Sequence, residues 1–350
     1  MNKTVTVKGV KKPYDILIGK NLFGVLPDKI KELSKAKTVV IITDDNVDKL
    51  YSNKVLEILQ SAGYNTLKFV FTHGEAHKTM ETVCEILEFL AQNCVTRSDL
   101  IVALGGGIVG DVSGFVAASY LRGIDFIQLP TTFLAAIDSS VGGKTGVNLK
   151  SGKNLAGAFY QPRLVICNTE TFNTLSEEIF KEGLCEAIKY GVICDKELFS
   201  LLSEDKNFDI ESVIERCVSI KAEIVSADEF DTGKRQLLNL GHTIGHAIEK
   251  TTNFEISHGI AVGIGMAIIS KISDTLSWSK EPTHSQIIKC LENNEIPTNT
   301  SATSKELLSA MAKDKKRTGD TINLVIPEKI GNCVLKSIAV SELEEVLKCR

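Results

Sequence analysis

The stretch LIVALGGGIVGD, residues 100–111, decides the fold of the first half of the chain. Its first five residues are aliphatic, a pattern typical of a strand buried on both faces of a parallel sheet. Three glycines follow at once, and residues 108–120 have helical periodicity. Glycines at such a turn let the backbone approach a phosphate group, with helix N–H groups directed at it. We therefore predict a phosphate-binding turn, with a plain tight turn as the alternative.

Strands and helices alternate on both sides of this turn. Strands are expected at residues 38–43, 66–71, 99–104, 124–129 and 164–167, and helices at 51–62, 79–93 and 108–120. The alternation predicts a parallel sheet covered by helices, whose ligands bind beyond the carboxyl ends of the strands.

After residue 171 helical periodicity dominates. Helices are expected at residues 176–192, 210–227, 234–250, 259–277, 284–293 and 304–313, and extended segments at 321–326 and 333–338. We therefore predict an α/β protein with two domains: an N-terminal parallel-sheet domain over residues 1–172 and a mostly helical domain over residues 173–350.

Composition narrows the class of protein. The chain has 350 residues, of which 43% are hydrophobic, enough for two buried cores. A net charge of −4 gives no overall attraction for nucleic acid or an anionic membrane, so an anionic ligand needs a local basic pocket. The N-terminus lacks a signal-peptide pattern and no apolar run is long enough to span a bilayer, so we expect a cytoplasmic location. The nine cysteines form no CxxC pair, which indicates reduced, buried thiols.

Polar residues that follow the strands are candidates for cofactor binding. The run GGGIVG satisfies GxGxxG, but Asp125 opens the next strand instead of ending it, which argues against the standard Rossmann arrangement. Asp44 and Asn46 follow an earlier strand and suit either ribose hydroxyls or a helix N-cap. Glu75 and Lys78 follow another strand, with a solvated loop as the alternative.

Residues 130–154, PTTFLAAIDSSVGGKTGVNLKSGKN, combine small, polar and cationic side chains. Lysines such as Lys144 and Lys153 supply point charges for phosphate. The segment GGKT resembles the end of a P-loop, but Asp138 occupies the position of the required first glycine, so that motif fails. We expect an anion-binding loop rather than an ordinary flexible one.

A metal site is indicated in the second half. Glu186 and Lys189 lie on the same face of one predicted helix, and a surface ion pair is the alternative interpretation of this spacing. His242 and His246 share another helix face, and His258 follows closely. Clustered histidines with a glutamate suit Zn²⁺ and leave one position for substrate, although buried structural histidines are the alternative. Spacing favours His242 and His246 as ligands without deciding between the three histidines, and the general base of an HExxH protease is absent.

Taken in chain order, the motifs resemble those of the 3-dehydroquinate synthase family. They are GGGIVGD, YLRGIDFIQLPTTFLAAIDSSVGGKTGVN, GKN, EAIKYG, RQLLNLGHTIGHAIE, SHG and DKK, and they cover nearly the whole chain. The resemblance implies an NAD-binding α/β domain over residues 1–172 and a helical metal- and substrate-binding domain over residues 173–350. It also implies a homodimer with NAD and one divalent metal, Zn²⁺ or Co²⁺.

The resemblance implies roles for individual residues. The implied metal ligands are Glu186, His242 and His258, in place of the pair that spacing favours, and His246 would then handle protons. The implied cofactor residues are Asp44, Asn46, Glu75, Lys78, Gly105, Gly106, Gly107, Asp111, Thr131, Thr132, Lys144, Lys153 and Thr174. The implied substrate and catalytic residues are Asp138, Lys144, Lys153, Asn154, Lys189, Lys221, Arg235, Asn239, His246 and Lys315, with Lys316 as the alternative to Lys315, and Arg122 reaching a neighbouring subunit.

The implied activity is that of a phosphate-eliminating lyase of the shikimate pathway. Members convert 3-deoxy-D-arabino-heptulosonate 7-phosphate to 3-dehydroquinate and phosphate, by transient NAD oxidation, phosphate elimination, re-reduction and intramolecular aldol closure. Oxidation makes a ketone that acidifies the neighbouring C–H, which makes elimination feasible. Three alternatives stay open: another sugar phosphate cyclase of the 2-deoxy-scyllo-inosose synthase type, a metal-dependent polyol dehydrogenase, and a nucleotide-binding regulatory module.

Overall fold

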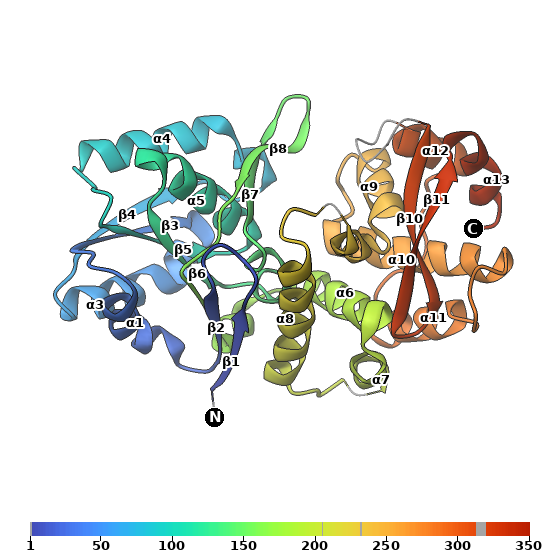
Figure 1. Cartoon of the computed structure of the whole chain (residues 1–350), viewed down its shortest axis with the longest axis horizontal. Coiled ribbons are helices and arrows are strands. Elements are labelled where there is room, and N and C mark those ends of the chain that lie inside the picture. Colours follow the sequence, from blue (N-terminus) through green and yellow to red (C-terminus); the bar gives the residue numbers. More distant parts are fainter. Residues whose placement is uncertain (1, 205, 232, 313–319) are drawn as a thin grey trace. The chain divides into compact units, whose positions relative to one another are not determined.

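The computed structural model of the chain describes residues 2–204, 206–231, 233–312 and 320–350 (Figure 1). Its contacts divide the chain into two compact units. Unit 1 contains Met1–Leu175 and Lys221–Phe230, and unit 2 contains Ser176–Ile220 and Asp231–Arg350. The domain boundary expected after residue 172 stays a prediction.

In its described residues, unit 1 contains a seven-stranded sheet with the order β1-β2-β9-β6-β5-β3-β4. Its strands are β1 (Lys3–Val7), β2 (Tyr14–Gly19), β3 (Thr38–Asp44), β4 (Asn65–Phe71), β5 (Leu100–Gly105), β6 (Asp125–Pro130) and β9 (Leu164–Asn168). The β1–β2 pair is antiparallel, and every other neighbouring pair is parallel. The expected parallel sheet is therefore confirmed, with β1 and β2 as additions.

Helices cover both faces of this sheet because successive strand residues point to opposite sides. On one face, Val39 and Val102 pack with α1 (Leu26–Leu33) and α3 (Asn53–Ser61). On the other face, Ile101 packs with α4 (Met80–Gln92) and α5 (Gly107–Ser119). Two buried faces explain why the central strands are apolar throughout instead of alternating.

The stretch expected to be a loop, residues 130–154, instead forms regular structure, so that prediction was wrong. After a helical turn at Ala135–Ser139, it enters an antiparallel hairpin of β7 (Lys144–Leu149) and β8 (Gly152–Phe159). Glycines there allow close pairing of strands: a Cβ on Gly157 would lie 2.2 Å from the carbonyl oxygen of Thr145.

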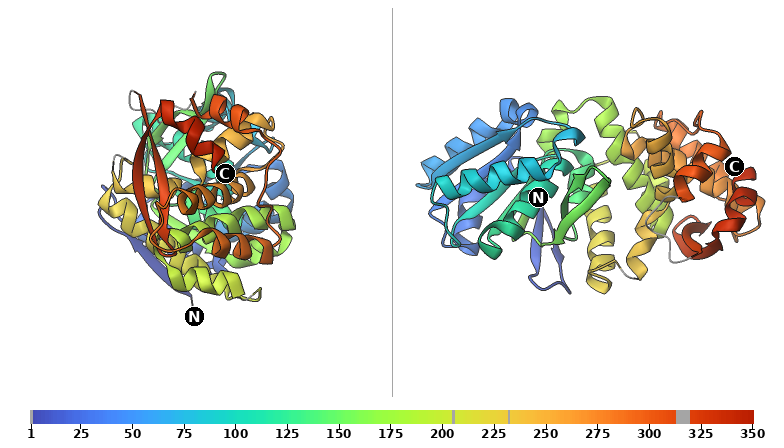
Figure 2. Two further views of the ribbon diagram at one scale, coloured as in Figure 1. Left: turned by 90° about the vertical axis from the view of Figure 1, so that its right-hand side faces the viewer. Right: turned by 90° about the horizontal axis from the view of Figure 1, so that it is seen from above.

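Unit 2 is mostly helical, as expected. The long helices of the second half are α6 (Glu177–Cys194), α7 (Lys196–Glu204), α8 (Ile210–Ala227), α9 (His242–Thr251), α10 (His258–Thr275), α11 (His284–Asn293) and α12 (Ser304–Ala312), and the chain ends with the shorter α13 (Leu343–Lys348). The strands β10 (Thr321–Lys329) and β11 (Asn332–Ala339) pair as an antiparallel ribbon (Figure 2). The α/β-plus-helical fold class is thereby confirmed.

Short helical segments fill several connections. They are α2 (Asp45–Val47) and the turns Leu22–Val25, Asp48–Ser52, Glu75–His77, Tyr120–Arg122, Thr169–Thr174, Lys234–Asn239 and Val340–Glu342. The turn Lys234–Asn239 corrects the expectation of one helix over residues 234–250. Gly241, with φ 75°, interrupts the helical conformation there, and α9 begins directly after it.

Two expectations from composition have different outcomes. In the part of the chain that the structure describes, no helix is both long enough and apolar enough to cross a bilayer. All nine cysteines are free thiols, but Cys84, Cys94 and Cys194 are exposed. The expectation of buried thiols was therefore wrong for these three, and Cys349 is only partly buried.

Candidate active site

A buried carboxylate lies at the centre of the first candidate site. Glu186 on α6 is 0% exposed, and Lys189, one turn later, is 1% exposed. Their side chains form an ion pair, so the alternative of a surface pair was wrong. Burying a carboxylate is costly unless cations or hydrogen-bond donors compensate its charge, so a cation close to Glu186 would stabilise this arrangement.

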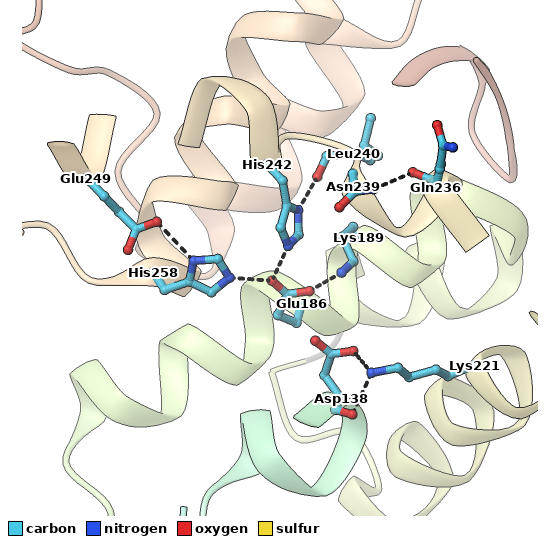
Figure 3. Close-up of polar contacts among 10 residues, drawn as sticks. All are labelled: Asp138, Glu186, Lys189, Lys221, Gln236, Asn239, Leu240, His242, Glu249 and His258. Atoms are coloured by element: carbon cyan, nitrogen blue, oxygen red, sulfur yellow. Dashed lines mark hydrogen bonds and ion pairs between the residues drawn. The ribbon is translucent and has the colours of Figure 1, made fainter. Parts of the chain in front are cut away.

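Two imidazole rings face Glu186 (Figure 3). Nε2 of His242 lies 3.7 Å from Oε1 of Glu186, and Nε2 of His258 lies 3.9 Å from the same oxygen. Nδ1 of His242 lies 3.1 Å from the carbonyl oxygen of Leu240. Because a carbonyl only accepts hydrogen bonds, Nδ1 carries the proton and Nε2 keeps a lone pair directed at Glu186.

His258 is oriented by a second carboxylate. Its Nδ1 lies 3.1 Å from Oε2 of Glu249, a residue on α9 that is 3% exposed. Burial disfavours the charged ring, but the hydrogen bond to Glu249 and the charges of Glu186 and Glu249 outweigh it and raise the pKa of His258. A carboxylate behind a ligating histidine is a common arrangement at zinc sites.

These donors fit a divalent metal ion. The ligand atoms of Glu186, His242 and His258 all lie within 4.8 Å of one another. Among the described residues, no hydrogen bond reaches either oxygen of Glu186, although Lys189 forms an ion pair with this carboxylate. Two imidazole nitrogens and a carboxylate are ligands that Zn²⁺ accepts, with a position left for substrate.

His246 lies beside this group. Its ring centroid is 5.6 Å from those of His242 and His258. A second possible ligand group consists of His246, Glu249 and His258. We favour the first group because Glu249 already accepts a hydrogen bond from His258, whereas Glu186 accepts none from the described residues.

Glycines allow the ligand-bearing helices to approach closely. A Cβ on Gly265 of α10 would lie 2.1 Å from the carbonyl oxygen of Gly241, directly before His242. A Cβ on Gly259, directly after His258, would lie 2.4 Å from the carbonyl oxygen of Glu182 on α6. Side chains at these positions would push apart the helices that bring the two histidines to Glu186.

The glycine turn after β5 forms a second candidate site, in unit 1. A Cβ on Gly106 would lie 3.2 Å from Cγ2 of Thr132, and one on Gly107 would lie 3.0 Å from Oγ of Ser139. Among the described residues, neither Oγ1 of Thr131 nor Oγ of Ser139 has a hydrogen-bond partner, although both atoms are buried. The turn thus gathers hydroxyl groups around the N-terminus of α5, as a phosphate site requires. Ser139 belongs to the polar segment 130–154, but no individual role was predicted for it.

Three residues expected at ligand sites meet at Lys78. Lys78 is 4% exposed, and its Nζ donates to Oδ2 of Asp111 and to Oδ1 of Asn154, each at 2.6 Å. The solvated-loop alternative was therefore wrong for Lys78. Glu75, by contrast, is exposed, and it accepts a hydrogen bond from Asn148 at 2.8 Å.

Asp138 and Lys221 form a further pair in unit 1 (Figure 3). Lys221 is 6% exposed, and its Nζ donates to the carbonyl oxygen of Asp138 at 2.6 Å and to the carboxylate of the same residue. Two residues expected to be catalytic are thus in direct contact, and both oxygens of Asp138 that accept from Lys221 hold its ammonium group in place.

Other expected residues have local contacts. The Asp44 carboxylate accepts from the backbone N–H groups of Asn46 and Val47, each at 2.9 Å, so it acts as an N-cap. Thr174 Oγ1 lies 2.6 Å from the hydroxyl of Tyr51. Asp125 pairs with Lys12 and Arg163 where β6 begins, in keeping with its exclusion from nucleotide binding.

The remaining expected residues differ in burial. Arg122, Lys144 and Lys153 are exposed, whereas Arg235 is 2% exposed. Asn239 donates to the carbonyl oxygen of Gln236 at 3.0 Å. Lys315 and Lys316 lie outside the described residues.

The fold is similar to that of sugar phosphate cyclases, and the solved structures of two such enzymes contain NAD⁺ and a metal ion. The fold matches a 2-deoxy-scyllo-inosose synthase complexed with carbaglucose-6-phosphate, NAD⁺ and Co²⁺, with a TM-score of 0.88, 26% identity and 99% of each chain covered. It also matches the 2-epi-5-epi-valiolone synthase of Streptomyces hygroscopicus with NAD⁺ and Zn²⁺ bound, with a TM-score of 0.85, 25% identity and 96% of each chain covered.

Sequence comparison narrows the class to one family. Residues 68–182 match the 3-dehydroquinate synthase N-terminal family, and residues 183–317 match the C-terminal one. The 3-dehydroquinate synthase of Clostridium acetobutylicum is 41% identical, with 99% of each chain covered. That of Clostridium botulinum strain Alaska E43 is 43% identical over 96% of this chain and 98% of the relative. The chain belongs to the 3-dehydroquinate synthase family.

Proposed function

We propose that this protein is a 3-dehydroquinate synthase that converts 3-deoxy-D-arabino-heptulosonate 7-phosphate to 3-dehydroquinate and phosphate. The observation that carries the proposal is the buried Glu186 carboxylate facing two imidazole nitrogens in a chain whose full-length relatives have this name. The proposal includes NAD and one divalent metal as cofactors, which accords with the ligands bound in the two related cyclases.

For the metal, Glu186, His242 and His258 are the proposed ligands. Bound there, a divalent ion would polarise and orient substrate hydroxyl groups as a Lewis acid. The chain's own part is to hold the ligands: the Leu240 carbonyl fixes one ring and Glu249 fixes the other. His246, beside the ligand rings, is the proposed proton-handling residue.

For NAD, the proposed contacts combine the glycine turn with polar residues of unit 1. They are Asp44, Asn46, Glu75, Lys78, Gly105, Gly106, Gly107, Asp111, Thr131, Thr132, Lys144, Lys153 and Thr174. Bound NAD would supply transient oxidation of a substrate hydroxyl without net redox change. The turn contributes helix N–H groups and closely placed hydroxyls for a pyrophosphate.

For the substrate, cationic and amide side chains are the proposed contacts. They are Lys144, Asn154, Lys189, Lys221, Arg235, Asn239 and Lys315, with Arg122 contributed by a second copy of the chain in a homodimer. Cations held by carboxylates, as Lys221 is by Asp138, would neutralise charge on the departing phosphate. Ring closure needs mainly a confined conformation. A cytoplasmic location completes the proposal.

Phosphate release from three sugar phosphates tests this assignment. The heptulosonate 7-phosphate is expected to release phosphate with NAD present, and glucose 6-phosphate and sedoheptulose 7-phosphate are expected to release none. Release from glucose 6-phosphate alone would instead support a 2-deoxy-scyllo-inosose synthase, the class of the structural relative with the TM-score of 0.88. NADH that accumulates with an alcohol would indicate a dehydrogenase.

A further inference from the structure

Asn148, in β7, connects two other segments of unit 1. Its backbone N–H donates to the carbonyl oxygen of Lys78 at 2.8 Å. Its side-chain Oδ1 accepts from the backbone N–H of Asn154 at 2.9 Å, and its Nδ2 donates to Oε1 of Glu75 at 2.8 Å. One residue therefore links the turn that contains Glu75 and Lys78 to the hairpin residue Asn154.

The chemistry of the partners fixes the orientation of the Asn148 amide. The backbone N–H of Asn154 can only donate, so it requires the amide oxygen. The Glu75 carboxylate can only accept, so it requires the amide nitrogen. Aspartate, which has nearly the same shape, would keep only the acceptor when ionised.

The contact to Asn154 has a structural consequence. Asn154 has φ 52°, a left-handed conformation that costs free energy unless its surroundings hold it. Its side chain meanwhile accepts from the buried ammonium of Lys78 at 2.6 Å. Asn148 thus anchors the backbone of a residue whose side chain completes the environment of Lys78.

We propose that Asn148 is a positioning residue that sets Glu75 for the cofactor through Nδ2 and Asn154 for the substrate through Oδ1. The proposal rests on the proposed function, which assigns Glu75 to NAD and Asn154 to the substrate. Asn148 itself then touches neither ligand. Its Nδ2 acts on NAD binding through Glu75, and its Oδ1 acts on substrate binding through Asn154.

Two substitutions separate the two halves of the amide. In Asn148→Asp the acceptor for Asn154 remains, but the donor is lost and two carboxylates face each other. We expect the dissociation constant of NAD to rise about tenfold and that of the heptulosonate 7-phosphate to change less than about twofold. In Asn148→Ala both contacts are lost, and we expect both dissociation constants to rise about fivefold or more.

Calorimetric titration gives both constants, and hydrogen–deuterium exchange of the β7–β8 amides reports on the hairpin. Exchange should increase in Asn148→Ala and stay near wild type in Asn148→Asp. Asn53→Ala, at an exposed asparagine of α3, is the matched control and should match wild type throughout.

Equal losses of NAD and substrate affinity in both variants would indicate a general structural role and overturn the inference, as would unchanged NAD affinity in Asn148→Asp. Failure of the proposed function looks different: the wild-type protein would bind NAD but release no phosphate from the heptulosonate 7-phosphate. A wild-type protein that binds no NAD would refute both.

Discussion

Nδ1 of His258 lies 3.1 Å from Oε2 of Glu249, which leaves Nε2 of the same ring 3.9 Å from Oε1 of Glu186. The carboxylate behind the ring therefore decides which nitrogen faces the proposed metal. The carbonyl oxygen of Leu240 likewise accepts a hydrogen bond from Nδ1 of His242 and orients that ring. The proposed metal centre thus depends on residues that would not contact the metal themselves.

Removing the Glu249 carboxylate should weaken metal binding. In Glu249→Leu the His258 ring loses its orienting partner, and we expect zinc affinity to fall about 10- to 100-fold. Glu249→Gln keeps an acceptor for Nδ1–H and should lose less. Competition with a chromophoric chelator measures the affinity, and Glu255→Gln, at an exposed residue nearby in sequence, is the control. Zinc binding by Glu249→Leu as tight as wild type would exclude this role.

Substitutions at the two α9 histidines distinguish the two possible ligand groups. In His242→Asn we expect zinc affinity to fall more than about 100-fold, because a ligand is lost. In His246→Asn we expect zinc affinity close to wild type but phosphate release slower by about 10²–10⁴-fold, the usual size of a general acid–base contribution. Metal analysis after dialysis and a phosphate assay provide the readouts. The reverse pattern of zinc loss would assign the metal to His246, Glu249 and His258.

Adding a single methyl group at Gly265 should disrupt the close packing of α9 against α10. In Gly265→Ala the new Cβ would lie 2.1 Å from the carbonyl oxygen of Gly241, so the helices must separate. We expect the free energy of unfolding to fall by about 3 kcal/mol and zinc affinity to fall with it. Gly24→Ala is the control, since a Cβ there has no heavy atom within 4 Å. Urea unfolding that gives equal stability for both variants would contradict the packing argument.

Asp99 should contribute stability that depends on pH. It is 5% exposed and accepts from the backbone N–H of Thr38 at 2.9 Å and from both N–H and Oγ1 of Thr96 at 2.7 Å. Burial alone would raise its pKa, but these hydrogen bonds, with one from Lys37, prevail and lower the pKa below the ordinary value. A lowered pKa in the folded state means that the stabilisation is complete above the unfolded-state pKa and is lost as pH falls through the folded-state pKa.

We therefore expect Asp99→Asn to lower the free energy of unfolding by about 2 kcal/mol at pH 7. The difference from wild type should shrink once the pH falls below about 4, near the pKa of an unperturbed aspartate. Urea unfolding at several pH values measures it, with the exposed Asp28→Asn as control. A difference that stays constant down to pH 3 would rule out the charge of Asp99 as its source.

Local patterns predicted the parallel sheet well because burial on both faces leaves a clear aliphatic signature in strands such as β5. They failed for the hairpin of β7 and β8, where glycines that permit close strand pairing resemble those of a flexible loop. Asp44 shows a further limit, since a capping carboxylate and a ribose-binding one look alike in sequence.

The proposed metal ligands show why spacing alone cannot decide between the three histidines. His242 and His246 share a helix face, so spacing favoured them as a pair. The left-handed Gly241 and the crossing of α9 with α10 instead bring His258 to Glu186. Contacts between helices that are far apart in sequence leave no periodic signal, so only the family resemblance selected these three residues. Glu249 and Asn148 were not predicted, because the partners of their side chains become visible only in the folded structure.

The most direct test of the account is release of inorganic phosphate from 3-deoxy-D-arabino-heptulosonate 7-phosphate, with NAD present, before and after removal of metal by a chelator. We expect release by the untreated protein, none by the metal-depleted protein, and recovery when about one equivalent of Zn²⁺ or Co²⁺ per chain is added. Undiminished release by protein shown to contain no metal would contradict the claim that Glu186, His242 and His258 hold an ion needed for the reaction.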